Sequence, residues 1–309
     1  MNWIAIALVG PLLWSFCNQL DRYFLNRYFA HGSLGVLMLF SSLAGALVLP
    51  PALFFSDPFK GYGLGQIALL LGSGMAGVFA IYLYLLALQD EEASVVVPFW
   101  QLCPVFGYAL GWMVLGETLS PRQMAASLAI VSGVLVLSWN HEAKEGTRGR
   151  FKWRLAALMG GSSLILGARA VAFKYVAIEN DFWGSCFWEY SGFVVAGVAI
   201  WIASPASRRA FLDMLKPRQH KDFSRIMSLV VLGEVLTLAG LLATNLALLM
   251  APVALVLVVE GLQPVFVFLI GTAATLFFPR FVTESLTKKA ITQKLVCLVA
   301  ICAASVWLE

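Results

Sequence analysis

The chain is dominated by apolar runs that are long enough to cross a lipid bilayer. Each has about 18–25 residues, the length that a hydrocarbon core about 30 Å thick requires of a helix. Charged residues make up only 12% of the 309 residues, against about 25% in a soluble domain. The first run follows Met1 without a basic leader, so we expect a retained helix rather than a cleaved signal peptide. The sequence therefore predicts an all-α integral membrane protein with ten transmembrane helices, at about 3–21, 33–55, 64–88, 94–115, 121–139, 154–177, 183–204, 226–250, 252–278 and 289–308.

A short motif within these runs occurs twice. The segment from Trp100 to Phe106 is repeated from Glu260 to Phe266, and an Ala-Leu pair precedes each copy at the same spacing, 160 residues apart. Each copy lies in the fourth run of a set of five, and a polar linker at 140–153 separates the sets. We therefore expect two five-helix repeats, 1–139 and 154–309. Because five is odd, the second repeat would be inverted in the membrane, as in many transporters.

Each copy of the motif contains a proline, Pro104 in the first and Pro264 in the second. A proline inside a helix removes one backbone hydrogen bond and crowds the preceding turn. In lipid, such a fault is tolerated where protein or a wet cavity satisfies the freed carbonyl. A packing kink would explain either proline alone. The matched pair favours helix-break hinges beside a central pathway.

Ionisable residues inside the runs are the candidates for chemistry, because charge within a bilayer is costly and usually faces a cavity or a partner. At 1.5 Å of rise per residue, Arg169, Glu189 and Glu260 lie at similar depths, and Glu234 lies in the other half of the membrane. We expect Glu260 to bind substrate or a proton, since it adjoins Pro264. Arg169 has the alternative of neutralising Glu189 or Glu260, and Glu234 of reaching toward the interface.

Polar and aromatic side chains near these charges complete the predicted site. They come from the first, fourth, eighth and ninth runs, where they recur at helical spacings. Helix packing is the alternative for the aromatic members. The predicted lining residues are Gln263, Gln101, Trp100, Asn18 and Asn245.

The placement of Lys and Arg predicts the orientation. Most of them fall in the connections after the first, fifth, seventh and ninth runs, whereas Lys60, Arg122 and Lys174 fall on the opposite side. Because basic loops stay in the cytoplasm, this bias places both termini outside it.

Other function classes lack their motifs. The five cysteines have no Cys-x-x-Cys spacing and all lie in apolar runs, so we expect no disulfide framework, metal site or cofactor. No zincin, nucleophile-elbow or phosphate-loop motif is present, and the three histidines are far apart. The protein is therefore not expected to be an enzyme. The basic loops are expected to meet anionic lipid headgroups rather than nucleic acid.

The first repeat contains Ala87-Leu88, Pro104-Val105-Phe106 and Gly116-Glu117-Thr118-Leu119, and with these motifs it resembles the EamA family of the drug/metabolite transporter superfamily. The resemblance implies a ten-helix inverted-repeat carrier with a central cavity. In the second repeat, the Gly-Glu-Thr-Leu turn is replaced by Pro279 to Leu286, and family members are commonly drawn with cytoplasmic termini, opposite to the charge bias. We expect Glu117 of that turn to cap or orient the chain rather than touch substrate. The residues that carry the resemblance are Ala87-Leu88, Ala93-Ser94, Pro98, Pro104-Val105-Phe106, Gly116-Glu117-Thr118-Leu119, Gln123 and Gly133-Val134-Leu135, with Trp14 and Asp21-Arg22-Tyr23 in the first run.

The predicted function is secondary active transport of a small polar metabolite across the cell (inner) membrane by alternating access. The excess of embedded glutamate favours an amine-bearing substrate, amino-acid or drug-like, with proton coupling. A neutral or anionic substrate held by Arg169 is a competing hypothesis. The alternatives outside this class are a lipid or lipid-linked-sugar translocator and a membrane sensor without flux. The protein is expected to be a monomer or homodimer among membrane lipids.

Overall fold

The computed structural model describes residues 2–17, 34–90, 96–138, 153–215, 223–263, 265–267 and 269–270, all of them in helices or short connections. Five helices are long and apolar enough to cross a membrane, and three shorter apolar helices accompany them. These eight helices and α8 (Pro121–Ser138) coincide with nine of the predicted spans. The tenth, at 289–308, lies outside the described residues. The multi-pass, all-helical class is therefore confirmed.

The first two spans are interrupted at prolines. Helix α1 (Trp3–Ala7) ends in a turn at Leu8 and continues to Cys17, because Pro11 has no N–H to donate to the Ala7 carbonyl. The next span consists of α3 (Leu34–Ala44), a 3₁₀ turn η1 (Gly45–Val48) and α4 (Leu49–Phe55), which has prolines in its first turn.

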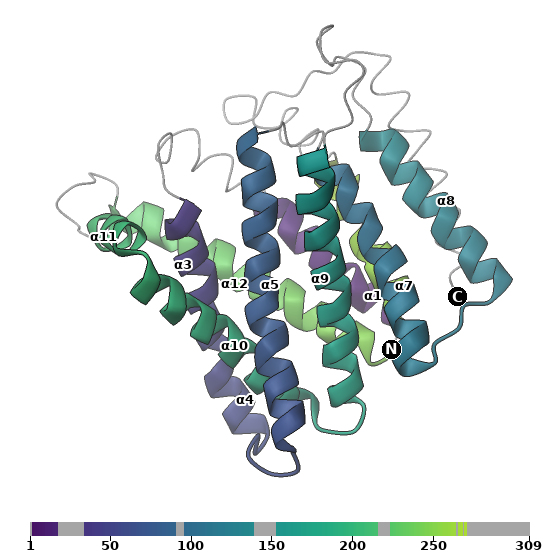
Figure 1. The fold of residues 1–309 in the computed structure, drawn as a ribbon, viewed down its shortest axis with the longest axis horizontal. Helices are drawn as coiled ribbons and strands as arrows, with labels where there is room; N and C mark the ends of the chain where they lie inside the picture. Colours follow the sequence, from purple (N-terminus) through teal and green to yellow (C-terminus); the bar gives the residue numbers. More distant parts are fainter. Residues whose placement is uncertain are drawn as a thin grey trace, which may run out of the picture.

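The remaining elements are longer and mostly regular. Figure 1 shows α5, α9 and α7 side by side, with α10 running obliquely across α5, and these pairs make extensive contacts. Their bounds are α5 (Leu64–Asp90), η2 (Val97–Gln101), α7 (Leu102–Leu115), α9 (Trp153–Ala177), α10 (Phe182–Ala203), α11 (Pro205–Met214), α12 (Phe223–Leu248) and α13 (Val253–Glu260).

Helix α13 is the most enclosed element in the described part of the chain. Every residue from Val253 to Val259 is buried, so this helix is apolar on all sides and is surrounded by other helices. It packs against α7, α1, α8, α9 and α12. Glu260, its last residue, therefore lies at the end of a fully enclosed helix.

Four short connections define one end of the bundle, which we call the short-turn end. They are residues 56–63, 116–120, 178–181 and 249–252. Aromatic rings gather there, including Phe59 against Trp188 and Phe55 stacked on Trp183. Such a belt is typical of a membrane–water interface.

Helix irregularities occur at matching positions of the two motif copies. In the first copy the 3₁₀ turn η2 gives way to α7 between Gln101 and Leu102, so Pro104 occupies the first turn of α7. In the second copy α13 ends at Glu260, and residues 261–262 form a turn. Pro264 itself lies outside the described residues. The interruptions therefore lie where a proline leaves the carbonyl four residues before it unpaired.

Neighbouring side chains satisfy carbonyls at both interruptions. Ser163 donates to the Phe99 carbonyl at 3.1 Å, and Ser15 donates to the Gln263 carbonyl at 3.2 Å. The Gln101 amide donates to the Gly261 carbonyl at 3.2 Å. These acceptors are neighbours of the carbonyls that the prolines free, so side chains from other helices solvate the irregular backbone at both places.

Candidate functional site

The candidate site begins where α5 crosses α10 with their backbones in contact. A Cβ at Gly74 would collide with the Glu189 carbonyl, and one at Gly192 with the Leu71 carbonyl. Only glycine permits this approach, as in other small-residue contacts between membrane helices. The crossing brings Ser73 of α5 against Glu189 of α10.

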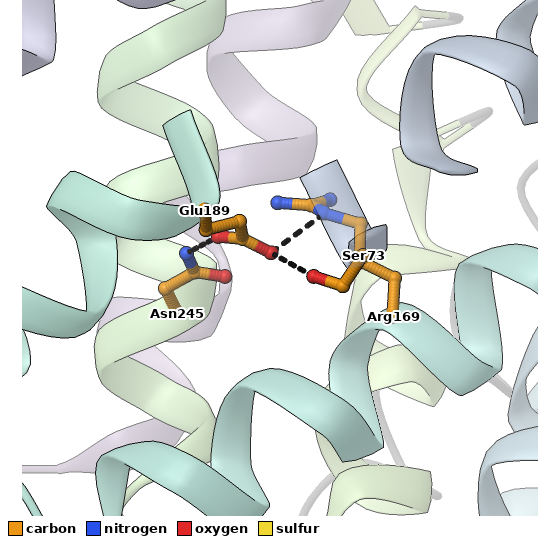
Figure 2. Close-up of polar contacts among 4 residues, drawn as sticks. All are labelled: Ser73, Arg169, Glu189 and Asn245. Carbon is orange, nitrogen blue, oxygen red and sulfur yellow. Dashed lines mark hydrogen bonds and ion pairs between the residues drawn. The ribbon is translucent and has the colours of Figure 1, made fainter. Parts of the chain in front are cut away.

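Glu189 is the centre of a buried hydrogen-bonded cluster (Figure 2). Its Oε1 accepts from Arg169 Nε at 2.9 Å and from Ser73 Oγ at 3.4 Å, and its Oε2 accepts from Asn245 Nδ2 at 2.7 Å. Glu189 has no exposed surface. Arg169 supplies the opposite charge, and the three donors satisfy the carboxylate, so removal of either charge would leave the other buried without its counter-ion.

The ion pair with Glu189 does not use all the donors of the Arg169 guanidinium. Its side chain is 11% exposed and lies over the Phe193 ring, 5.4 Å from the centroid. Gly77 makes room for it, because a Cβ there would come within 3.2 Å of Arg169 Cδ. The Nε donates to Glu189, but the buried Nη2 has no hydrogen-bond partner among the described residues. A donor left over in this way can bind a ligand acceptor.

Glu260 adds a second carboxylate near this cluster. It lies within electrostatic range of Arg169 and beside the hydroxyl of Thr244. The buried Thr244 Oγ1 itself makes no hydrogen bond in the described part of the chain. Arg169, Glu189 and Glu260 thus share one region, which agrees with their matched depths in the sequence.

Gln101 connects the two copies of the motif. Its repeat counterpart, 160 residues later, is Gly261, the residue whose carbonyl accepts its amide hydrogen. A Cβ at Gly261 would lie 2.9 Å from Gln101 Oε1, so glycine is needed for this contact. That Oε1 is buried and has no hydrogen-bond partner among the described residues.

The other predicted residues lie at varied distances from the cluster. Trp100 packs on Tyr84 with ring centroids 4.4 Å apart, and its buried Nε1 has no partner in the described ranges. Gln263 is half-buried. Glu234 accepts a hydrogen bond from Ser41 of α3 at 2.9 Å, in an exposed contact. Asn18 lies outside the described residues.

Sequence reasoning missed one member of the cluster. Ser73 belongs to the glycine-rich stretch Gly72–Gly77, whose small residues predict close helix packing rather than phosphate binding. The close packing is present, and the contact at Gly74 also brings Ser73 within hydrogen-bond distance of Glu189. A serine between packing glycines was the available signal.

Within the described residues, no group of His, Cys, Asp and Glu could hold a metal ion. A groove of about 350 Å³ is lined by Leu43, Val198, Trp201 and Phe211. These apolar side chains do not suit a polar metabolite.

Comparison with known proteins agrees with this architecture. Residues 1–139 match the model of the EamA-like transporter family. No curated protein matches the chain significantly. A solved crystal structure superposes with a TM-score of 0.70 over 99% of this chain and 95% of its own, at 16% identity. At that identity the likeness concerns the fold alone.

Proposed function

We propose, from the match of residues 1–139 to the EamA-like transporter family, that the chain is a secondary active carrier and not an enzyme. Its cargo would be a small polar metabolite that carries an amine and a carboxylate, as amino acids do. It would work by alternating access, with a proton as the coupling ion. The cell (inner) membrane is the proposed location.

We propose that ten helices form two inverted repeats around the Gln101–Gly261 contact. In a structure with a pseudo-twofold axis, equivalent residues touch only on the axis. The contact between counterparts 160 residues apart supports an axis at this point. Transporters of this plan bind substrate at the repeat interface, beside discontinuous helices.

The groups left available near this contact favour a zwitterion. Both oxygens of Glu189 accept hydrogen bonds from protein donors, so Glu189 holds Arg169 in place. The free Nη2 of Arg169 would bind the substrate carboxylate, because guanidinium suits planar anions. Glu260 would bind the ammonium group, and the Gln101 Oε1 would accept from it. Trp100, Gln263 and Asn245 would shape the wall.

The observation that carries this proposal is the buried Nη2 of Arg169, which has no hydrogen-bond partner among the described residues. A buried donor without an acceptor costs about 1–3 kcal/mol, more when charged. A substrate oxygen would relieve that cost. Proton coupling would follow if protonation of Glu260 competed with the substrate ammonium group.

Thermal-shift measurements in detergent test the substrate class. The ligands are amino acids, the amines made from them by decarboxylation and the acids made by deamination. The proposal expects stabilisation by the amino acids and much weaker effects of the other two sets. Stabilisation by acids alone would favour Arg169 as the ligand of an anion and overturn the role of Glu260.

Three variants assign the roles in proteoliposome uptake of the stabilising amino acid. Glu260→Gln should abolish uptake. Arg169→Lys keeps a positive charge beside Glu189 but loses the Nη2 donor, so it should weaken substrate affinity. Glu179→Gln, an exposed glutamate on the connection after α9, is the matched control. Full uptake by Glu260→Gln would refute the assignment.

The same experiments address the other classes. A lipid or lipid-linked-sugar translocator would scramble labelled lipid in vesicles and ignore soluble ligands. A sensor would bind ligand without flux into sealed vesicles. Either result would replace the carrier proposal.

A further inference from the structure

A second buried ion pair lies outside the central cluster. Lys174 Nζ is 2.5 Å from Glu117 Oε1, with the side chains 9% and 14% exposed. Glu117 follows α7 in the first half of the chain, whereas Lys174 belongs to α9 in the second half. The pair therefore joins the two halves.

Both members of the pair also hold the turn between α12 and α13. Glu117 Oε2 accepts from the backbone N–H of Val253, the first residue of α13, at 2.8 Å. Lys174 Nζ donates to the Ala251 carbonyl at 2.6 Å. A carboxylate at the beginning of a helix is favoured by the helix dipole. The two side chains and the two backbone groups, from three segments of the chain, thus form one connected set of polar contacts.

The local sequence is suited to this contact. Gly116 ends α7 with φ of +67°, a conformation that glycine adopts at low cost. It turns the chain so that Glu117 points back along the bundle. At Gly111, a Cβ would come within 3.0 Å of Glu117 Oε2. Each glycine has a specific role in bringing the carboxylate to α13.

The contact lies between the central cluster and the short-turn end. Lys174 follows Arg169 by five residues on α9, which is about 7–8 Å along the helix axis. Beyond it, α9 ends at Ala177. The pair therefore lies between one and two helical turns nearer to the short-turn end than Arg169.

We propose that Glu117 and Lys174 form a gate that closes the short-turn end of the pathway in this structure. Opening that end breaks the ion pair and releases the beginning of α13, the helix that ends in Glu260. As the two halves rotate against each other, one end of the pathway closes while the other end opens. The gate's consequence for transport rests on the proposed carrier function, but its opening is measured without any substrate.

Native cysteines report opening. Cys186 lies on α10 on the short-turn side of Glu189 and has no exposed surface, whereas Cys17 is buried in the first span against α12. In detergent, the rate of maleimide labelling at each cysteine is measured by peptide mass spectrometry. Gate opening raises labelling of Cys186 alone, and general unfolding raises both.

Glu117→Gln and Lys174→Gln should each raise Cys186 labelling by about tenfold or more, with Cys17 unchanged, because a lone buried charge strongly disfavours the closed contact. The double variant should label no faster than either single variant, since both remove one interaction. Asp57→Asn, which breaks the exposed Lys60–Asp57 pair at the same end, should have no effect.

The gate would be overturned if both single variants labelled Cys186 no faster than Asp57→Asn does. It would also be overturned if the two effects multiplied in the double variant. Where removal of a charge prevents folding, Glu117→Asp keeps the charge and shortens the reach, and the same rise at Cys186 is expected. Loss of uptake with unchanged labelling would likewise contradict the gate. Faster labelling of Cys186 in a protein that transports no ligand would support the gate and refute the proposed carrier function.

Discussion

Replacing Glu189 by Gln is the sharpest test of the central cluster. The side chain has no exposed surface and accepts hydrogen bonds from Arg169, Asn245 and Ser73. Gln keeps the volume, so no cavity forms. It leaves the Arg169 guanidinium charged and almost enclosed, and removing one member of a buried pair costs about 3–5 kcal/mol.

That cost predicts a large thermal effect. For a chain of this size, 1 kcal/mol corresponds to about 2 °C in Tm, so Glu189→Gln should melt about 6–10 °C below the wild type. Arg169→Gln should lose a similar amount. The double variant Arg169→Gln/Glu189→Gln should recover most of the loss, because the uncompensated charge is what destabilises.

Thermal unfolding in detergent, followed by circular dichroism, measures these differences. Asp57→Asn is the control, since it breaks an ion pair whose side chains are 85% and 49% exposed. Exposed pairs contribute little, so its Tm should not change. A Glu189→Gln protein that melts within about 2 °C of the wild type would refute the reasoning, as would a double variant that loses the sum of both single losses.

Substitutions at other contacts are expected to change the stability by smaller amounts. Gly74→Ala should destabilise by about 1–3 kcal/mol, as overpacking does, because its Cβ would meet the Glu189 carbonyl; Gly72→Ala, with open space around it, should be neutral or stabilising, and equal melting of the two would contradict the crossing. Gln101→Leu should cost about 1–3 kcal/mol by leaving the Gly261 carbonyl unpaired, which an unchanged urea midpoint would exclude. Gly116→Ala should cost roughly 1–2 kcal/mol, because its φ of +67° is left-handed; the matched control is Gly160→Ala, which meets no atom within 4 Å.

The sequence predicted local features well. Nine of the ten predicted spans coincide with described helices, because hydrophobic length is a property of each segment alone. It also predicted helix breaks at Pro104 and Pro264, because a proline removes a backbone hydrogen bond whatever surrounds it; irregular helix is present at 97–101 and 261–262, next to these positions. Only the structure shows which side chains donate to the backbone carbonyls there, because those side chains come from neighbouring helices.

The sequence left the roles of the charges open. It offered Arg169 two partners and counted Lys174 only as a charge on the less basic side of the membrane. In the structure Arg169 pairs with Glu189, and Lys174 is buried against Glu117. Depth along a helix follows from residue count, but the direction in which a side chain points depends on packing.

By itself, then, the sequence determined the membrane class, the spans, the motif 160 residues apart and the depth that Arg169, Glu189 and Glu260 share. Those are consequences of hydropathy, backbone chemistry and helical rise. Only the tertiary structure decided that Glu189 is committed to Arg169 while the Nη2 of Arg169 stays unpartnered among the described residues. The reason is that glycine contacts such as Gly74 against Gly192 set how closely helices approach, and that approach selects which buried charges meet.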